Sequence, residues 1–298
     1  MSTRARGMDH AHYPYSPANT RPRLRWPGDT RIAVNVMLYF EYLELEPPAG
    51  SVRDPRFHWR HDPDIRQHSW HEYGARVGIF RVLDALNRHD FKVTVAANAM
   101  ACERYGYLVE AFKQRGYEFA AHGISASRMI TSKMTEAEER ETIRQTLKRI
   151  TAAVGTCPKG WVCQDYGESF RTPSLMAEVG MDYIVDWPND DQPYRMTAGE
   201  LVSIPNQAAW DDVQFLWDRH MPLRRYPQII GDIVEAFDRE GHETGKYLGL
   251  GLHPWLIGAP HRIRYLEEAL AKVAACQSIW RCTAGQVASH FRSATPHK

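Results

Sequence analysis

The sequence predicts an α/β fold, a distorted (β/α) barrel of about seven or eight strands. Short apolar segments rich in β-branched residues alternate with amphipathic segments of helical period, and strands that alternate with helices pair in parallel. The length of 298 residues also fits one such barrel. An open doubly wound sheet is the alternative. No Gly-x-Gly-x-x-Gly turn follows any predicted strand, so a dinucleotide site has no support.

The N-terminal region predicts an irregular arm followed by one domain. Residues 1–30 are rich in Pro, Arg and Tyr and follow no period, whereas 31–298 carry the alternating pattern of a single catalytic barrel domain. The barrel begins with 31–40, a short apolar run typical of a buried strand. The segment 43–72 contains four prolines and predicts a long loop, a feature that is usually functional in compact domains.

The rest of the chain continues the alternation. A helix is expected over about 74–89, with an apolar face that consists of Val77, Phe80, Leu83 and Leu86. Thr135 and Glu138 form the pattern of a capping box, which begins a helix that extends to about residue 154. Further strands are expected at 91–97, 117–121, 159–163, 182–185, 201–204, 246–252 and 278–282. Further helices are expected at 104–116, 171–180, 226–241, 261–275 and 284–292.

Composition excludes several classes of function. Lys and Arg total 37 against 36 Asp and Glu, a net charge of +1 that is not typical of nucleic-acid or polybasic membrane binding. No apolar run approaches the roughly 18 residues of a spanning helix, and the first residues lack the apolar core of a signal peptide. The five cysteines are scattered without a Cys-x-x-Cys pair. We expect a reduced, cytoplasmic protein whose partner is a small-molecule substrate.

Polar side chains follow the predicted strands at their carboxyl ends, where the catalytic groups of a parallel barrel gather. These side chains are Glu41, Asn98, His122, Asp165, Asp186, Trp187 and His253. A carboxylate can take a proton from water, a histidine can protonate a leaving nitrogen, and a second acid can orient the histidine. Each residue alone also fits a structural role, such as a helix N-cap or a buried hydrogen-bonded histidine. Their convergence on one rim favours hydrolysis.

Other candidate groups fit catalysis less well. Cys163 at a strand end could act as a nucleophile, but buried cysteines are usually inert, and no Gly-x-Ser-x-Gly turn supplies a serine nucleophile. Arg76 could hold a substrate oxygen or form a structural ion pair. Several histidines match no compact metal-site spacing, and we interpret them as polar loop residues: His10, His12, His58, His61, His68 and His71.

The segments at the strand ends resemble a known family. In order, residues 34–41, 122–125, 160–173, 182–187 and 250–254 resemble the five motifs of the polysaccharide deacetylase family, which has the NodB-homology fold. The resemblance covers about 30–292. Residues 70–78 and 189–194 resemble the subgroup that contains the metal-independent allantoinase and the cyclic imide hydrolases. The resemblance implies a distorted barrel of NodB type.

The resemblance also implies that the metal site of the family is incomplete. Family deacetylases hold a divalent metal with one Asp and two His. Here Tyr42 stands at the position of the Asp ligand and Ala126 at that of the second His, so His122 alone remains. A catalytic Zn²⁺ requires about three protein ligands. We expect no tightly bound metal, although Glu44 or Asp165 as substitute ligands leaves weak zinc binding open.

The resemblance implies a hydrolase of carbon–nitrogen bonds that opens a cyclic amide, imide or ureide. Glu41 is the expected base and His253 the acid, oriented by Asp186, while His122 donates to the carbonyl oxygen. The residues expected to contact substrate are Asn98, Asp165, Trp187, Trp70 and Tyr194. Two alternatives stay open: a metal-dependent N-deacetylase of polysaccharides or amino sugars, and a non-catalytic binding protein. The arm and the subgroup favour a homodimer or homotetramer.

Overall fold

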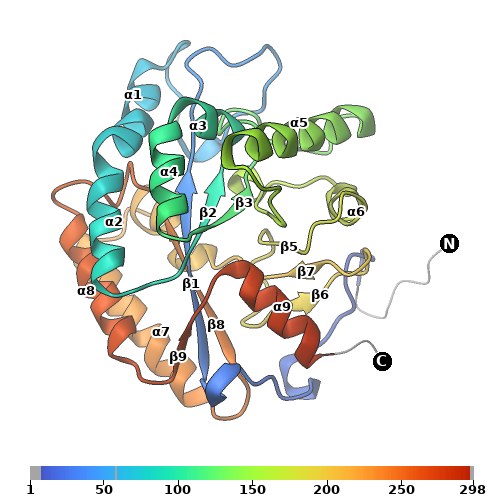
Figure 1. Ribbon diagram of the computed structural model, residues 1–298, viewed down its shortest axis with the longest axis vertical. Helices are drawn as coiled ribbons and strands as arrows, with labels where there is room; N and C mark the ends of the chain where they lie inside the picture. The colour runs from blue at the N-terminus through green and yellow to red at the C-terminus, as the bar shows by residue number, and fades with distance from the viewer. Residues whose placement is uncertain (1–7, 58, 296–298) are drawn as a thin grey trace.

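The computed structural model describes residues 8–57 and 59–295 (Figure 1). His58, one of the histidines considered above, lies outside the described residues. Within them, no helix is both long and apolar enough to cross a membrane.

A nine-stranded sheet forms the centre of the fold, with its strands in the order β6-β7-β5-β4-β3-β2-β1-β8 and with β9 paired to β1. The strands are β1 (Ile32–Phe40), β2 (Val93–Ala97), β3 (Glu118–Ala121), β4 (Gly160–Trp161), β5 (Tyr183–Ile184), β6 (Tyr194–Arg195), β7 (Val202–Ser203), β8 (Lys246–Leu252) and β9 (Ile279–Arg281). All described pairs are parallel except that of β6 with β7. The sheet curls into a barrel that is not fully closed, because β6 and β8 do not pair with each other in the described chain (Figure 1). The predicted fold class is confirmed.

Helices surround the outer face of the sheet. They are α1 (Ile65–Tyr73), α2 (Ile79–Arg88), α3 (Ala99–Arg104), α4 (Gly106–Gln114), α5 (Glu136–Val154), α6 (Thr172–Glu178), α7 (Tyr226–Glu240), α8 (Ile263–Ala275) and α9 (Ala284–Ala294). Helices α2, α7 and α8 pack in a row on the left of Figure 1, and α3, α4 and α5 form a second group. Helix α9 packs against β5 and β7 instead. The capping box predicted at the start of α5 is confirmed, because Thr135 accepts from the Glu138 amide and Glu138 accepts from that of Thr135.

The central strand β1 separates two apolar clusters. Its residues Ile32, Val34, Val36, Leu38 and Phe40 join the large cluster under the outer helices. Ala33, Met37 and Tyr39 belong to a second cluster together with Trp26 of the arm and Val287 of α9. Since successive side chains of a strand point to opposite faces, β1 is buried on both sides. The ends of β1, β2, β3 and β8 are therefore held by packing from both directions.

The segment 43–89 differs from the prediction of a loop at 43–72 followed by one helix at about 74–89. The helix begins earlier, at α1, where the Asp64 side chain accepts from the Gln67 amide. It continues through a π-helical turn at Gly74–Gly78 into α2. A π-turn contains an extra residue and rotates the residues that follow. Leu83 and Leu86 are buried as predicted, but Phe80 is 47% exposed.

Several other boundaries also move. The predicted helix at 104–116 is α4, and the shorter helix α3, which was not predicted, precedes it across the non-helical backbone of Tyr105. The strands predicted at 159–163, 182–185 and 201–204 shorten to the two-residue strands β4, β5 and β7. The antiparallel strand β6 was not predicted. All five cysteines are free, as their scattered positions indicate.

Candidate active site

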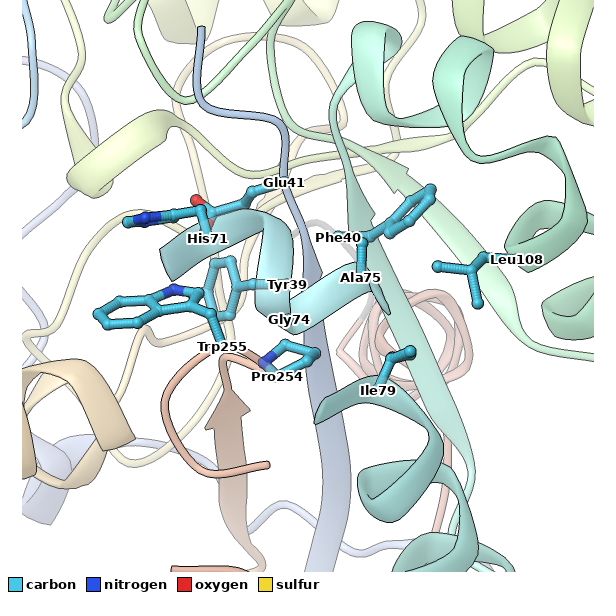
Figure 2. Close-up of a pocket in the computed structure, with 10 residues that line it drawn as sticks. All are labelled: Tyr39, Phe40, Glu41, His71, Gly74, Ala75, Ile79, Leu108, Pro254 and Trp255. Atoms are coloured by element: carbon cyan, nitrogen blue, oxygen red, sulfur yellow. The ribbon is translucent and has the colours of Figure 1, made fainter. Parts of the chain in front are cut away.

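The candidate site lies at the carboxyl ends of the central strands. Glu41 directly follows β1, His122 follows β3, and His253 follows β8. These strands are parallel and lie close together in the sheet, so their ends meet at one edge. Figure 2 shows Glu41, His71 and Trp255, which line a small cavity of about 20 Å³. The structure thus brings together the carboxylate and the two histidines that the sequence singled out.

Glu41 and His122 form a buried pair. His122 Nε2 lies 3.3 Å from Glu41 Oε1, and His122 Nδ1 lies 2.7 Å from the carbonyl oxygen of Val162. Both facing oxygens can accept a hydrogen bond, so each ring nitrogen of His122 already has a partner within the protein. This corrects the expectation that His122 donates to a substrate carbonyl, because neither ring nitrogen is free to do so.

The neighbours of Glu41 keep it ionised. Burial by itself would raise the pKa of Glu41, but the hydrogen bond from His122 and the positive charges of His253 and His122 outweigh burial and lower the pKa to about 2. Its second oxygen, Oε2, is buried and has no hydrogen-bond partner among the described residues. Glu41 therefore presents one free acceptor atom.

His253 is held by two contacts with Asp212. Its Nδ1 lies 2.6 Å from Asp212 Oδ1, and its backbone amide donates to Asp212 Oδ2 at 2.8 Å. Asp211 Oδ2 lies 4.0 Å from the same ring nitrogen. Burial by itself lowers the pKa of His253, but the charges of Asp212 and Asp211 raise it to about 9. His253 is therefore an imidazolium near neutral pH, with Nδ1 donating to Asp212.

Asp186 does not orient His253, which corrects the role that the family pattern implied. Its Oδ1 accepts from the backbone amide of Cys163 at 2.7 Å. Asp212, just before the π-helical turn η7 (Val213–Asp218), takes the orienting role instead. The sequence offered one signal for it, an Asp-Asp pair in a segment without a period, but nothing in that signal tied it to β8.

Asp186 belongs to a separate buried group with Cys163 and Glu168. Burial and the charge of Asp186 raise the pKa of Glu168 well above its usual range, and burial also raises the pKa of Asp186. Burial and the same two acids raise the pKa of the Cys163 thiol, so Cys163 is not an activated nucleophile.

His71 is a site residue that the sequence interpretation missed. It lies on α1, is 4% exposed, and stacks on Trp255 with ring centroids 4.5 Å apart. Its Nδ1 lies 2.9 Å from the carbonyl oxygen of Gln67. Burial lowers the pKa of His71 to about 4. Its buried Nε2 has no hydrogen-bond partner within the described chain.

Two glycines make this contact possible. A Cβ atom on Gly74 would lie 2.7 Å from the backbone nitrogen of Trp255, and one on Gly78 would lie 2.1 Å from the Pro254 carbonyl oxygen. Only glycine allows the turn after α1 to approach the loop after β8 so closely. The buried face of α1 and this turn includes Gln67, His71, Gly74 and Gly78, a helical spacing that an apolar period does not reveal.

The chain is similar to several known proteins. The sequence profile of the polysaccharide deacetylase family matches residues 72–184. A polysaccharide deacetylase-like protein of Schizosaccharomyces pombe is 26% identical over 95% of this chain and 96% of its own length. Over these residues the chain is similar to polysaccharide deacetylases.

Solved structures extend the likeness to nearly the whole chain. A "probable polysaccharide deacetylase" of Pseudomonas aeruginosa is 27% identical with a TM-score of 0.84, covering 94% of this chain and 97% of its own. The PuuE allantoinase is 26% identical with a TM-score of 0.83, covering 94% of this chain and 96% of its own. The fold is therefore shared, over nearly the whole chain, with structures that carry these two descriptions.

The residues at the family's metal position do not fit a metal. The guanidinium of Arg104 lies 4.4 Å from the centre of the Tyr42 ring, and Ala126 offers no ligand atom. Glu44 is held by Arg128 at 2.6 Å, and Asp165 by Arg56 at 2.8 Å. Each of these two potential substitute ligands is therefore already paired with an arginine.

Two clusters of potential metal ligands lie elsewhere in the described residues. They are Cys163 with Glu168 and Asp186, and Asp211 with Asp212 and His253. In the second cluster His253 Nδ1 donates to Asp212 and is not available as a ligand. Neither cluster includes Glu41 or His122.

The aromatic residues expected to contact substrate occupy two places. Trp70 packs edge-on against Trp217 at 4.8 Å, on the side of α1. Trp187 packs edge-on against Tyr13 of the arm at 5.3 Å, and Tyr13 also contacts Tyr194 at 4.9 Å. No ring contact joins Trp70 to Trp187 or Tyr194 among the described residues, so these three side chains divide between two aromatic groups.

Asn98 and Asp165 are engaged by the protein. Asn98 Oδ1 accepts from the Tyr42 amide at 3.0 Å, and its Nδ2 donates to the His122 carbonyl, so it braces the strand ends rather than facing substrate. Asp165 pairs with Arg56, and burial raises the pKa of Asp165 to about 6. Arg56 is itself buried, and its Nη1 lacks a hydrogen-bond partner in the described part of the chain.

Proposed function

We propose that the protein is a carbon–nitrogen hydrolase that opens a cyclic amide, imide or ureide without a tightly bound metal. The observation that carries the proposal is the pairing, at one rim, of an ionised Glu41 with a protonated His253. A carboxylate base and an imidazolium acid are the two groups that hydrolysis of an amide needs. The likeness to the PuuE allantoinase supports a ring substrate.

The reaction begins with attack of water on a ring carbonyl. Glu41 accepts one proton from the water as the new C–O bond forms, and the electron pair of the C=O bond moves to the carbonyl oxygen. The C–N bond then breaks as the carbonyl re-forms, and His253 gives its Nε2 proton to the leaving nitrogen. The products are a carboxylic acid and the opened amide or urea nitrogen.

The oxyanion formed in the first step needs hydrogen-bond donors. Two buried donor atoms, Arg56 Nη1 and Trp255 Nε1, have no partner among the described residues. A preorganised donor of this kind stabilises such a transition state by about 3–4 kcal/mol. An imide or ureide carbonyl is more electrophilic than that of an N-acetyl group. Its hydrolysis therefore requires less stabilisation of the oxyanion than deacetylation does.

The proposal is tested by incubating purified, chelator-treated protein with succinimide, hydantoin and allantoin, and with chitin oligosaccharides. Ring opening is followed by loss of ultraviolet absorbance or by mass spectrometry. We expect turnover of at least one ring substrate, which Glu41→Gln lowers by about 10²–10⁴-fold. No turnover on a broad panel of rings would refute the proposal.

A second candidate function is metal-dependent N-deacetylation. The names of its relatives favour it: the Helicobacter pylori peptidoglycan deacetylase is 20% identical over 76% of this chain and 87% of its own length. Release of acetate from chitin oligosaccharides, lost with a chelator and restored by zinc or cobalt, would establish this alternative. A non-catalytic role would instead be supported if wild type bound a ring ligand as tightly as Glu41→Gln and turned over nothing.

A further inference from the structure

We propose that Glu41 and His71 together hold the attacking water, each by accepting one of its two hydrogens. The inference rests on the proposed ring-opening function and assigns to His71 a role as a positioning residue. It starts from two buried acceptor atoms, Glu41 Oε2 and His71 Nε2, which line one cavity (Figure 2) and have no partner among the described residues.

The hydrogen-bonding state of His71 follows from its contacts. A carbonyl oxygen can only accept, so the 2.9 Å contact with the Gln67 carbonyl places the ring proton on Nδ1. Burial keeps the ring neutral by lowering its pKa to about 4. Nε2 therefore carries a lone pair, and no proton, across the physiological pH range. The stack on Trp255 and the edge contact with Phe57 at 4.6 Å fix the direction of that lone pair.

Glu41 presents the second acceptor. Its Oε1 is occupied by His122, and the carboxylate is ionised, so Oε2 also has only lone pairs to offer. Two acceptors cannot bond to each other, so each needs a donor, and one water molecule carries two O–H donors. In Figure 2 the imidazole of His71 and the carboxylate of Glu41 lie together at the same side of the cavity.

Water suits this pair of acceptors better than the alternatives. A single N–H of a ring substrate serves one acceptor and leaves the other buried and unpaired, at a cost of about 1–3 kcal/mol. A cation is disfavoured because the imidazolium of His253 already acts on Glu41. Among the described residues, the groups close enough to share an ion include neither Glu41 nor His71.

This arrangement also orients the nucleophile. When both hydrogens of the water are held, a lone pair on its oxygen remains for the substrate carbonyl, and Glu41 is in place to take the proton. Orientation of this kind lowers the barrier by restricting the water before attack, and its loss costs about 10²-fold in rate. His71 moves no proton in this scheme.

Three substitutions at His71 separate positioning from structure. In His71→Gln the amide oxygen reaches the place of Nε2, whereas in His71→Asn the amide reaches only that of Nδ1. His71→Phe keeps a ring of similar shape without any acceptor. The matched control is His68→Phe on the same helix, because His68 Nδ1 contacts the Leu43 carbonyl at 2.8 Å and faces no part of the cavity lining.

With a ring substrate that wild type opens, we expect kcat to fall about 10²-fold in His71→Phe and His71→Asn, with KM changed by less than about three-fold. His71→Gln should recover most of this loss, and His68→Phe should match wild type. The pH limbs of kcat should stay in place in all active variants, because His71 does not titrate in that range. An unchanged kcat in His71→Phe, or a displaced pH limb in His71→Gln, would overturn the inference while leaving the ring-opening function intact.

A measurement without substrate keeps the inference testable if no ring is opened, the outcome that refutes the proposed function. A high-resolution crystal structure of the unliganded protein should contain a water within hydrogen-bond distance of both Glu41 Oε2 and His71 Nε2. The same water should be absent in His71→Phe, whose melting temperature serves as the folding check. An ion at that position, or no water in contact with both atoms in wild type, contradicts the inference.

Discussion

His253 and His71 are both buried beside Glu41, yet their neighbours give them opposite charges. Asp212 and Asp211 surround His253 and raise its pKa to about 9, whereas His71 faces the uncharged Gln67 carbonyl and burial lowers its pKa to about 4. One histidine is therefore a proton donor and the other a neutral acceptor at the same pH. The difference arises from which group meets Nδ1, a carboxylate or a carbonyl.

At this scale we predict the effect of Asp212→Asn. The amide keeps the shape of the carboxylate but removes the charge that raises the pKa of His253, so the pKa should fall by about 1–3 units. The alkaline limb of kcat, which reports loss of the His253 proton, should move to lower pH by the same amount. The measurement is kcat for a ring substrate between pH 6 and pH 10.

Asp186→Asn is the control for this experiment. Asp186 accepts from the Cys163 amide and does not contact His253, so its substitution should leave the alkaline limb in place. If Asp186→Asn moved the limb and Asp212→Asn did not, the orienting role would belong to Asp186 after all.

The N-terminal arm is the element that packs on the loop after β5. The His12 carbonyl accepts from the Thr197 amide at 2.8 Å, and Arg21 pairs with Asp190 at 2.5 Å. Between these contacts, Tyr13 packs edge-on against Trp187 and accepts from Asn189 Nδ2 at 3.0 Å. The arm therefore covers Trp187 at the end of β5 and holds the loop after it.

At the scale of the element, Tyr13→Ala should loosen the arm. Each aromatic pair that it removes contributes about 0.5–1.5 kcal/mol beyond burial. Hydrogen exchange of the Thr197 amide, which donates to the neighbouring residue of the arm, should become faster. Peptide-level exchange followed by mass spectrometry measures this change.

Tyr15→Ala provides the matched substitution. Tyr15 is two residues further along the arm and is 67% exposed, so its loss should leave exchange at Thr197 as in wild type. Equal acceleration by both variants would mean that the arm is held by its backbone rather than by the Tyr13 ring.

In the whole molecule, the curled sheet brings the candidate catalytic groups together at one site. β1 lies between β2 and β8 with β9 also paired to it, and its two faces are closed by the outer helices and by the arm with α9. Charged groups at the strand ends are thereby buried together. Their protonation consequently contributes to the stability of the entire fold.

We predict a pH dependence of global stability from His253. Its pKa in the folded protein is about 9, above the 6.5 of an unperturbed histidine. The stabilisation is fully present below about pH 6.5 and is lost as pH rises through about 9, a total on the order of 3 kcal/mol. Denaturant unfolding between pH 6.5 and pH 8.5 should therefore give a free energy of unfolding that falls with pH.

Asp212→Asn should flatten this dependence, since it removes the charge that binds the proton. The comparison cancels contributions from groups that titrate alike in both proteins. Equal slopes for wild type and Asp212→Asn would contradict the assignment of the effect to His253.

Part of the site could be predicted from local sequence. Glu41, His122 and His253 each follow an apolar run that is recognisable as a strand, and parallel strands bring their ends to one edge whatever the loops do. The same reasoning could not assign roles to Asp186 or Asn98, because it predicts where a residue lies and not which atoms its side chain contacts. Asp186 meets the Cys163 amide, and Asn98 meets two backbone groups.

Apolar periodicity is a local property of the chain, and it was enough to predict the α/β class, the order of the main elements, and the carboxylate and two histidines at the rim. The contact of Asp212 with His253, the place of His71 in the cavity, and the separate ring contacts of Trp70 and Trp187 became evident only from the folded chain. Those choices depend on the paths of long loops and on a π-helical turn packed through glycines against the loop after β8. Contacts between segments distant in the chain leave no period that a single sequence reveals.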